Sequence, residues 1–187
     1  MVKKRACVFI SGKGTNLNTL IKRSRDNSFP IKIELIISNK KNAKGLMYAK
    51  KFAIPFLIIN TSKKNHYLKT LNEITKRNIS VICLAGYMKI LPKNFIRSFK
   101  KPIINIHPSL LPKFKGINTY KRIIKNKEKM TGCTVHLVNE HLDSGKIILK
   151  KSFKIEPYDN EKTLKIKTQR VEYKSYPEAI IKLLGKY

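Results

Sequence analysis

An amide and an imidazole side chain, those of Asn105 and His107, stand two residues apart at the end of an apolar run that begins at Pro102. Residues i and i+2 of a strand point to the same side, so these two side chains should project together. Pro108 follows directly and prevents the strand from simply continuing. Two hydrogen-bond donors fixed at a strand end are suited to stabilise the oxyanion that develops when a carbonyl carbon is attacked. Asn105 and His107 are therefore the candidate catalytic pair.

A carboxylate that could serve this pair lies in the segment Asp143-Ser144-Gly145. Asp143 could orient His107, or it could take a proton from an attacking amine. The same three residues are also typical of a hairpin turn, and spacing along the chain does not choose between the two roles. His136, on a predicted strand nearby in the sequence, is expected to be a supporting residue at most.

A second candidate site is the turn at residues 11–16, which joins an apolar strand to a helix. Gly12 and Gly14 let the backbone approach a ligand closely, and the helix N-terminus offers free amides to a phosphate. Thr15 and Asn16 add side-chain donors. The pattern is neither a Walker A loop nor a complete Gly-x-Gly-x-x-Gly, and a plain tight turn in which Thr15 caps the helix is an equal alternative.

Strand-like and helix-like segments alternate before the catalytic pair. Strands are predicted at 6–10, 31–38, 56–59, 80–85 and 102–106. Helices are predicted at about 17–21, at 43–52, through 68–74 with Thr61 or Ser62 as the cap, and at about 92–99. Such alternation with short connections predicts a parallel, doubly wound sheet, in which ligands gather beyond the carboxyl ends of the strands.

The rest of the chain changes this pattern. A helix is predicted at about 120–126, strands at 131–139 and 146–155, and a final helix that Asp159 or Asn160 caps and that runs to about residue 183. The last two strands, joined by a turn, should pair antiparallel. We predict the α/β class: a single domain over residues 1–187 with a doubly wound, mostly parallel sheet, an antiparallel C-terminal strand pair and a closing helix.

The chain has 187 residues, of which 42% are hydrophobic and 28% charged, as in a globular protein. Its 41 basic and 11 acidic residues give a net charge of +30. This charge would suit nucleic acid, but the lysines are dispersed and there is no aromatic-rich stacking strand, so we do not expect nucleic-acid binding. A positive field would still help to collect small anions such as phosphates.

The apolar segments and the cysteines of the sequence indicate the compartment and the metal content of the protein. No apolar run could span a bilayer, and the apolar segment after the basic N-terminus is too short for a signal peptide, so we expect a cytoplasmic protein without a membrane partner. Cys7, Cys83 and Cys133 lie in or at the start of apolar runs, far apart, and should be buried reduced thiols. There is no zinc motif, and we expect no metal.

Four motifs occur in a fixed order along the chain: 9–17 (FISGKGTNL), 84–91 (LAGYMKIL), 105–112 (NIHPSLLP) and 132–145 (GCTVHLVNEHLDSG). Together they resemble the glycinamide ribonucleotide formyltransferase family, and the resemblance covers essentially the whole chain. It implies transfer of a formyl group from the co-substrate 10-formyltetrahydrofolate to the amine of 5'-phosphoribosylglycinamide, a step of de novo purine biosynthesis. It also implies that the Leu111–Pro112 peptide bond is cis.

The resemblance assigns roles to particular residues. It implies catalysis by Asn105, His107 and Asp143, a phosphate loop at Gly14, Thr15 and Asn16, a carboxylate for the substrate amine at Glu172, and a folate pocket at Lys64, Met88, Lys89, Ile90, Leu91, Asn139, Glu140, His141 and Leu142. Asn105 and a protonated His107 would hold the oxyanion, and Asp143 would keep His107 charged. Many members have arginine at the positions of Lys64 and Lys89, and lysine lacks the bidentate fork of arginine.

Three alternatives compete with this assignment. Methionyl-tRNA formyltransferase shares the Asn-x-His-Pro-Ser-Leu-Leu-Pro motif but carries an additional C-terminal domain. Formyltetrahydrofolate hydrolase usually has an N-terminal regulatory domain. A basic nucleic-acid-binding module would need neither formyl-folate nor Asp143. A monomer and a homodimer are equally compatible with the sequence.

Overall fold

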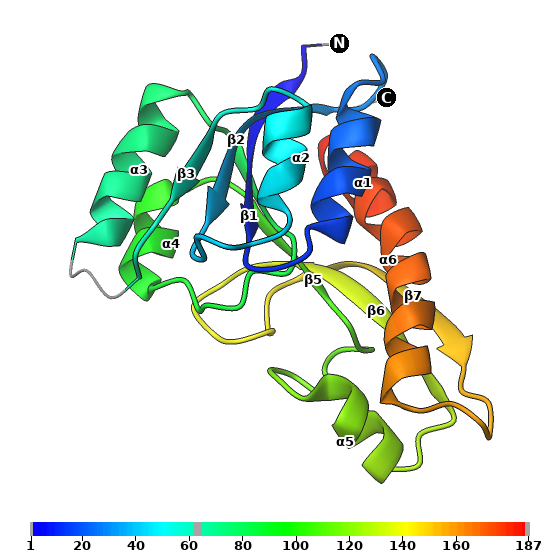
Figure 1. The fold of residues 1–187 in the computed structure, drawn as a ribbon. Helices are drawn as coiled ribbons and strands as arrows, with labels where there is room; N and C mark the ends of the chain where they lie inside the picture. Colours follow the sequence, from blue (N-terminus) through cyan, green and yellow to red (C-terminus); the bar gives the residue numbers. More distant parts are fainter. Residues whose placement is uncertain (1, 62–64, 186–187) are drawn as a thin grey trace. The chain divides into compact units, whose positions relative to one another are not determined.

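The computed structural model describes residues 2–61 and 65–185 (Figure 1). The chain divides into two compact units, of which the second spans Asn105–Leu183 and the first comprises the residues before it together with the C-terminal end. The prediction that residues 1–187 form one formyltransferase domain stays a prediction.

The first unit alternates strands and helices as predicted. Its elements are β1 (Lys4–Ile10), α1 (Thr15–Ser24), β2 (Ile31–Ser38), α2 (Leu46–Lys51), β3 (Phe56–Ile58), α3 (His66–Lys76), β4 (Val81–Leu84), α4 (Lys93–Phe99) and the start of β5 (Ile103–His107). The strand order is β3-β2-β1-β4-β5, and β1 pairs parallel with both β2 and β4. The chain therefore moves outward from β1 to β3 and then returns to the other side of β1. The order reverses between β1 and β4, which is the switch point of a doubly wound sheet.

The core of the first unit follows from the apolar run that forms β1. Residues 6–10 are all completely buried, as expected for a strand covered on both faces. Phe9 packs edge-on against Phe95 of α4 and against Tyr87, with ring centroids 6.2 and 5.2 Å away. Helices α1 and α2 both pack against β2, and α3 lies beside α4 (Figure 1).

Three element boundaries differ from the predictions in this unit. Helix α2 is shorter than 43–52 because residues before it form turns, and the Gly45 amide donates to the Gly12 carbonyl at 2.8 Å. Helix α3 begins at His66 with Asn65 at its N-cap, so the cap at Thr61 is wrong; Ser62 lies outside the described residues. Helix α1 has Gly14 at its N-cap, and the alternative in which Thr15 caps it is also wrong.

The second unit contains the end of β5, α5 (Thr119–Lys125), β6 (Met130–Leu137), β7 (Ile147–Lys154) and α6 (Glu161–Leu184). Its strand order is β5-β6-β7, and β6 and β7 pair antiparallel with a register shift between Val135 and His136. The Asn160 side chain accepts the amides of Lys162 and Thr163, so this predicted cap of the closing helix is confirmed. The predicted α/β class, with its mostly parallel strands, antiparallel C-terminal pair and closing helix, is confirmed.

Several smaller expectations are also settled. Cys7, Cys83 and Cys133 are buried and are not joined in disulfides, as predicted. The Leu111–Pro112 peptide bond is cis, as the resemblance implied. Over the two described stretches of the chain, every helix is too short or too polar to cross a membrane.

Candidate active site

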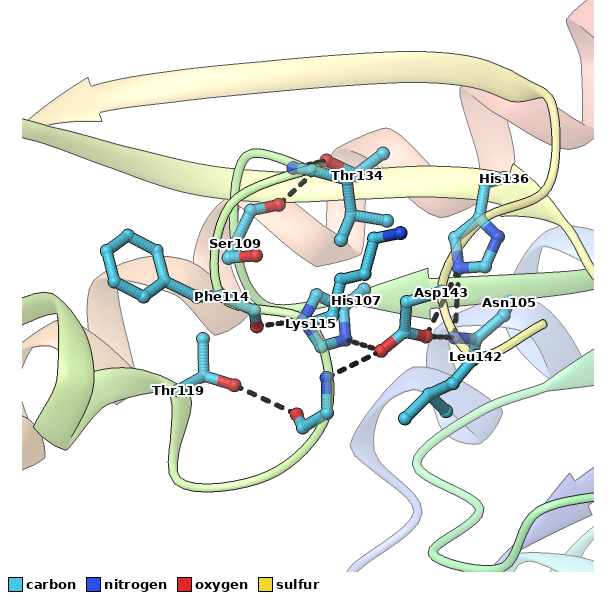
Figure 2. A network of polar contacts seen from close by, with 12 residues as sticks. Asn105, His107, Ser109, Phe114, Lys115, Thr119, Thr134, His136, Leu142 and Asp143 are labelled. Carbon is cyan, nitrogen blue, oxygen red and sulfur yellow. Dashed lines mark hydrogen bonds and ion pairs between the residues drawn. The ribbon is translucent and has the colours of Figure 1, made fainter.

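Strand β5 carries Asn105 and His107 on one side, and both side chains reach the carboxylate of Asp143 (Figure 2). Asn105 Nδ2 lies 3.5 Å from Asp143 Oδ1, and His107 Nδ1 lies 3.3 Å from Asp143 Oδ2. The two-residue period of the strand explains why both side chains face the same group. The three predicted catalytic residues are therefore brought together within the second unit.

Asp143 reaches this position because of the turn that holds it. Its φ of 46° is left-handed, a conformation that aspartate adopts more readily than most residues. Gly145 closes the turn, and a Cβ atom there would stand 1.7 Å from the Leu137 carbonyl oxygen, so no side chain fits. The Asp143 side chain is only 7% exposed, and its Oδ2 accepts the Gly116 amide at 2.8 Å. The two roles that the sequence left open are thus both present: a turn, and a carboxylate in contact with His107.

The imidazole of His107 is held from both ends. Its Nε2 lies 2.9 Å from the Phe114 carbonyl oxygen, while its Nδ1 faces Asp143 (Figure 2). Burial lowers the pKa of His107 below its ordinary value, and this effect outweighs the Asp143 carboxylate and the Phe114 carbonyl, which both raise it. The Phe114 carbonyl and the Asp143 carboxylate are both acceptors, so a proton on either ring nitrogen has a partner within reach. The expectation that Asp143 keeps His107 charged stays a prediction.

His136, which the sequence suggests as a supporting residue at most, contacts Asn105 and Asp143. Its Nδ1 lies 2.8 Å from the Leu137 carbonyl oxygen, and its Nε2 lies 3.2 Å from Asn105 Nδ2 and 3.6 Å from Asp143 Oδ1. The residue is 2% exposed and stands at the register shift of β6. Strand bulges often redirect a side chain beside an active site, but no feature of the sequence marks this one.

The charge of Asp143 is stabilised by its surroundings. Burial alone would raise the pKa of this carboxyl, but the His136 hydrogen bond, the Gly116 amide and the two neighbouring histidines lower it below its ordinary value. Asp143 is therefore ionised at neutral pH. The cluster thus consists of one fixed negative charge, a neutral amide and two imidazoles.

The loop after β5 is fastened to β6 by a buried threonine. Thr134 Oγ1 donates to the Ser109 carbonyl at 2.7 Å and accepts the Leu111 amide at 3.0 Å. Ser109 Oγ in turn donates to the Lys113 carbonyl at 2.7 Å. These bonds fix the path of the chain up to Phe114, whose carbonyl holds His107.

The predicted phosphate loop lies in the first unit, at the carboxyl end of β1. Gly14 has a φ of +70°, and a Cβ atom there would stand 2.6 Å from the Gly45 Cα, so only glycine fits. Gly14 has no side chain with which to cap α1, and its carbonyl accepts the Asn18 amide. Asn16 is buried at 7% exposure. Helix α1 thus begins within the predicted phosphate loop, which stays a prediction.

The predicted folate residues fall into two loops, one in each unit. In the first unit, Met88 and Ile90 are 71% and 72% exposed and Lys89 is also exposed, whereas Leu91 is buried. In the second unit, Asn139 and His141 are exposed, Leu142 is 51% exposed, and Glu140 is half-buried. Lys64 lies outside the described residues.

Glu172, the carboxylate predicted to meet the substrate amine, is buried in α6 at 7% exposure. It acts electrostatically on two neighbours. Burial is the main cause that raises the pKa of Tyr120, and the Glu172 carboxylate raises it further. Burial is also the main cause that raises the pKa of Cys133 to about 11, and Glu172 adds to it.

Known proteins resemble this chain in sequence and in fold. A family model described as "Formyl transferase" matches residues 4–180. Phosphoribosylglycinamide formyltransferase of Haemophilus influenzae is 42% identical, over 95% of this chain and 85% of that protein. A crystal structure of the Brucella melitensis enzyme of the same name superimposes with a TM-score of 0.93 at 34% identity, covering 100% of this chain and 98% of that one.

A longer relative matches this chain over a small part of its own length. The trifunctional purine biosynthetic protein adenosine-3 of Drosophila melanogaster is 37% identical over 98% of this chain, which spans 14% of that protein. The family model, the relatives at 30% identity or more and the solved structure all point to one group of enzymes. The chain belongs to the formyl transferase family.

Proposed function

We propose that this chain is an enzyme that transfers the formyl group of 10-formyltetrahydrofolate to the amine of 5'-phosphoribosylglycinamide, in de novo purine biosynthesis. The products are the N-formyl compound and tetrahydrofolate. The observation that carries the proposal is the contact of Asn105, His107 and Asp143 in a chain of this family. Formyl transfer to an amine needs donors for an oxyanion and a group that handles one proton, and this cluster offers both.

The first step is attack of the substrate amine on the formyl carbon. A carbon–nitrogen bond forms, and the electron pair of the carbonyl moves to oxygen. Asn105 is the donor best placed to change partner, because its contact with Asp143 at 3.5 Å is at the limit of a hydrogen bond. His107, when it is protonated, offers a second donor. The oxyanion is thus met by groups already fixed in place, which reduces the cost of reorganisation.

The second step is collapse of the tetrahedral adduct. The bond from the formyl carbon to N10 of the folate breaks, and its electron pair stays on that nitrogen. Overall, one proton leaves the attacking amine and one reaches N10. A buried His107 with a lowered pKa can accept a proton and release it again near neutral pH. While His107 carries that proton, the adjacent Asp143 carboxylate stabilises the charge.

The substrate sites are part of the same proposal. The Gly14–Asn16 backbone and the start of α1 would take the phosphate of phosphoribosylglycinamide, and Glu172 would meet its amine. The exposed apolar side chains of Met88 and Ile90 would contact the pterin, together with Lys89, Leu91 and the loop of Asn139, Glu140, His141 and Leu142. Lys64 would add a cation.

An assay with three acceptors tests the proposal. Purified protein is mixed with 10-formyltetrahydrofolate and either phosphoribosylglycinamide, formyl-acceptor tRNA or water alone, and tetrahydrofolate and formyl product are followed. We expect formyl transfer only with phosphoribosylglycinamide. Formylated tRNA, or formate released without an acceptor, would replace the proposal by one of the other formyl-folate activities. No turnover with any acceptor would overturn it.

A further inference from the structure

Ser11 is the residue of the β1 loop that neither the phosphate assignment nor the catalytic cluster uses. It is 4% exposed and follows directly on Ile10, the last residue of β1. Its Oγ accepts the Met88 amide at 2.8 Å and donates to Asn39 Oδ1 at 2.5 Å. Its own amide donates to the Gly86 carbonyl at 3.2 Å. One side chain and one amide therefore join the ends of β1, β2 and β4.

These bonds cross the switch point of the sheet. Strands β1 and β4 are neighbours at the place where the strand order reverses, and the carboxyl ends of such strands form the ligand crevice of open α/β sheets. The segment from Gly86 to Ile90 has no helix or strand of its own. Its shape must therefore come from the groups that hold its backbone.

The far end of the same segment has a separate support. Tyr67 Oη lies 3.4 Å from the Ile90 carbonyl and 3.3 Å from the Tyr87 hydroxyl. The Tyr67 ring also packs against Phe95, with centroids 5.3 Å apart. The segment is thus tied at both ends while Met88 and Ile90 remain more than two-thirds exposed. Exposed apolar side chains on a fastened backbone are suited to contact the face of a flat heterocyclic ring.

The hydroxyl chemistry makes Ser11 specific for this task. A hydroxyl has one donor and two acceptor sites, so Ser11 can accept from Met88 and donate to Asn39 at the same time. Asn39 thereby orients the Ser11 lone pair toward the Met88 amide. Removal of the hydroxyl would leave that amide without its partner, and a shift of the backbone would follow.

We propose that Ser11, oriented by Asn39, is a positioning residue that sets the backbone of the Gly86–Ile90 loop for the pterin of formyl-folate. The proposal rests on the proposed function, which assigns that loop to the folate. Ser11 acts through Met88 and touches neither substrate. Its effect should therefore appear in folate affinity and not in the chemical step.

Steady-state kinetics with each substrate varied in turn tests the proposal. In Ser11→Ala, the KM for 10-formyltetrahydrofolate should rise roughly tenfold, as expected when a buried donor loses its partner. The KM for phosphoribosylglycinamide and the kcat should stay within about twofold of wild type, because only uniform binding is lost. Asn39→Ala should change the folate KM in the same direction by a smaller factor. Ser11→Thr, which keeps the hydroxyl, should remain closer to wild type than Ser11→Ala.

Ser80→Ala is the matched control, because the Ser80 hydroxyl likewise bonds a backbone group of the first unit. It donates to the Arg5 carbonyl, next to the amino end of β4. It should leave both KM values unchanged. Equal rises of both KM values in Ser11→Ala and Asn39→Ala would show a merely structural role and would overturn the proposal. Unchanged folate KM in both variants would do the same.

A measurement without substrates separates this inference from the proposed function. Hydrogen exchange of the Met88 amide, followed by NMR, should be faster in Ser11→Ala and in Asn39→Ala than in wild type. Absence of formyl transfer by wild type would refute the proposed function alone. Unchanged Met88 exchange in both variants would refute the positioning by Ser11 whatever the enzyme's reaction.

Discussion

The catalytic cluster of the second unit and the loops of the first unit are built by different parts of the chain. In the cluster, side chains of Asn105, His107, His136 and Asp143 contact one another and are largely withdrawn from water. In the loops at 11–16 and 86–91, backbone amides and carbonyls do most of the bonding, and glycine at position 14 permits the close approach to Gly45. Chemistry therefore depends on the identity of single side chains, whereas binding depends on backbone shape. Substitutions in the cluster should act on kcat, and those in the loops on KM.

The largest effect should come from removal of an oxyanion donor. Asn105→Ala and His107→Ala should each lower kcat by roughly 10²–10³ while the protein stays folded. The measurement is kcat at saturating substrates, together with thermal unfolding. Asn27→Ala, which truncates an exposed amide of the first unit, is the control and should turn over normally. Near-normal kcat in purified His107→Ala would end the assignment of the cluster as the catalytic site.

Asp143→Asn should have the next largest effect. Asparagine tolerates the left-handed conformation and can still accept the Gly116 amide, so the turn should survive and only the charge is lost. Because the proton on His107 would then lack its counter-charge, kcat should fall by about 10². The pH profile of kcat separates this effect from a folding defect. Asp26→Asn, at an exposed aspartate, serves as the control; a full kcat in Asp143→Asn would show that the carboxylate only shapes the turn.

A loop substitution should move the other kinetic constant. Met88→Ala should raise the KM for 10-formyltetrahydrofolate about tenfold, since burial of a methionine side chain against a ligand stabilises by roughly 1.5–3 kcal/mol. The kcat of Met88→Ala should stay unchanged. Met47→Ala is a matched control, because Met47 is likewise an exposed methionine of the first unit, at 58%. A drop in kcat without a change in KM for Met88→Ala would break the division between chemistry and binding.

The smallest effect concerns how the free energy of unfolding depends on pH. Because the folded pKa of His107 is below the unfolded value of about 6.5, the unfolded chain binds more protons in this window. The contribution of neutral His107 to stability is complete above that value and is lost as pH falls toward the folded pKa. Denaturant unfolding of wild type and His107→Asn at pH 7 to 5 should therefore converge by at most about 1.4 kcal/mol per pH unit. Asn27→Ala, which truncates an exposed side chain without a titratable group, should keep the wild-type slope. Identical slopes in wild type and His107→Asn would contradict the lowered pKa.

The sequence predicts the strands best, because their signal is local. The run from Ala6 to Ile10 is apolar throughout and becomes a fully buried strand. The pair Asn105 and His107 is equally readable, since a two-residue spacing fixes the side on which both project. Helix boundaries are less readable, because competing turns decide them. At Gly45, a bond to the Gly12 carbonyl, distant in sequence, replaces a helical one.

The remaining parts of the site depend on contacts that no local pattern contains. Whether Asp143 serves only its turn or also His107 is decided by the return of the chain after β6. His136 enters the cluster at a register shift that the alternation of residues does not reveal. The lowered pKa of His107 depends on how completely the ring is buried, and spacing along the chain carries no information about that.

The left-handed backbone at Asp143 also limits which mutations can be sampled there. Asparagine and glycine suit such a conformation, whereas β-branched and bulky residues are strained in it. Glutamate would restore a carboxylate, but its longer side chain would start from a strained backbone and overshoot the Gly116 amide. In a library that places every residue type at position 143, we expect a few types to allow folding. Only one of these should also allow turnover. A selection for stability would then accept several residues at position 143. A selection for growth that depends on the enzyme's activity would accept only aspartate.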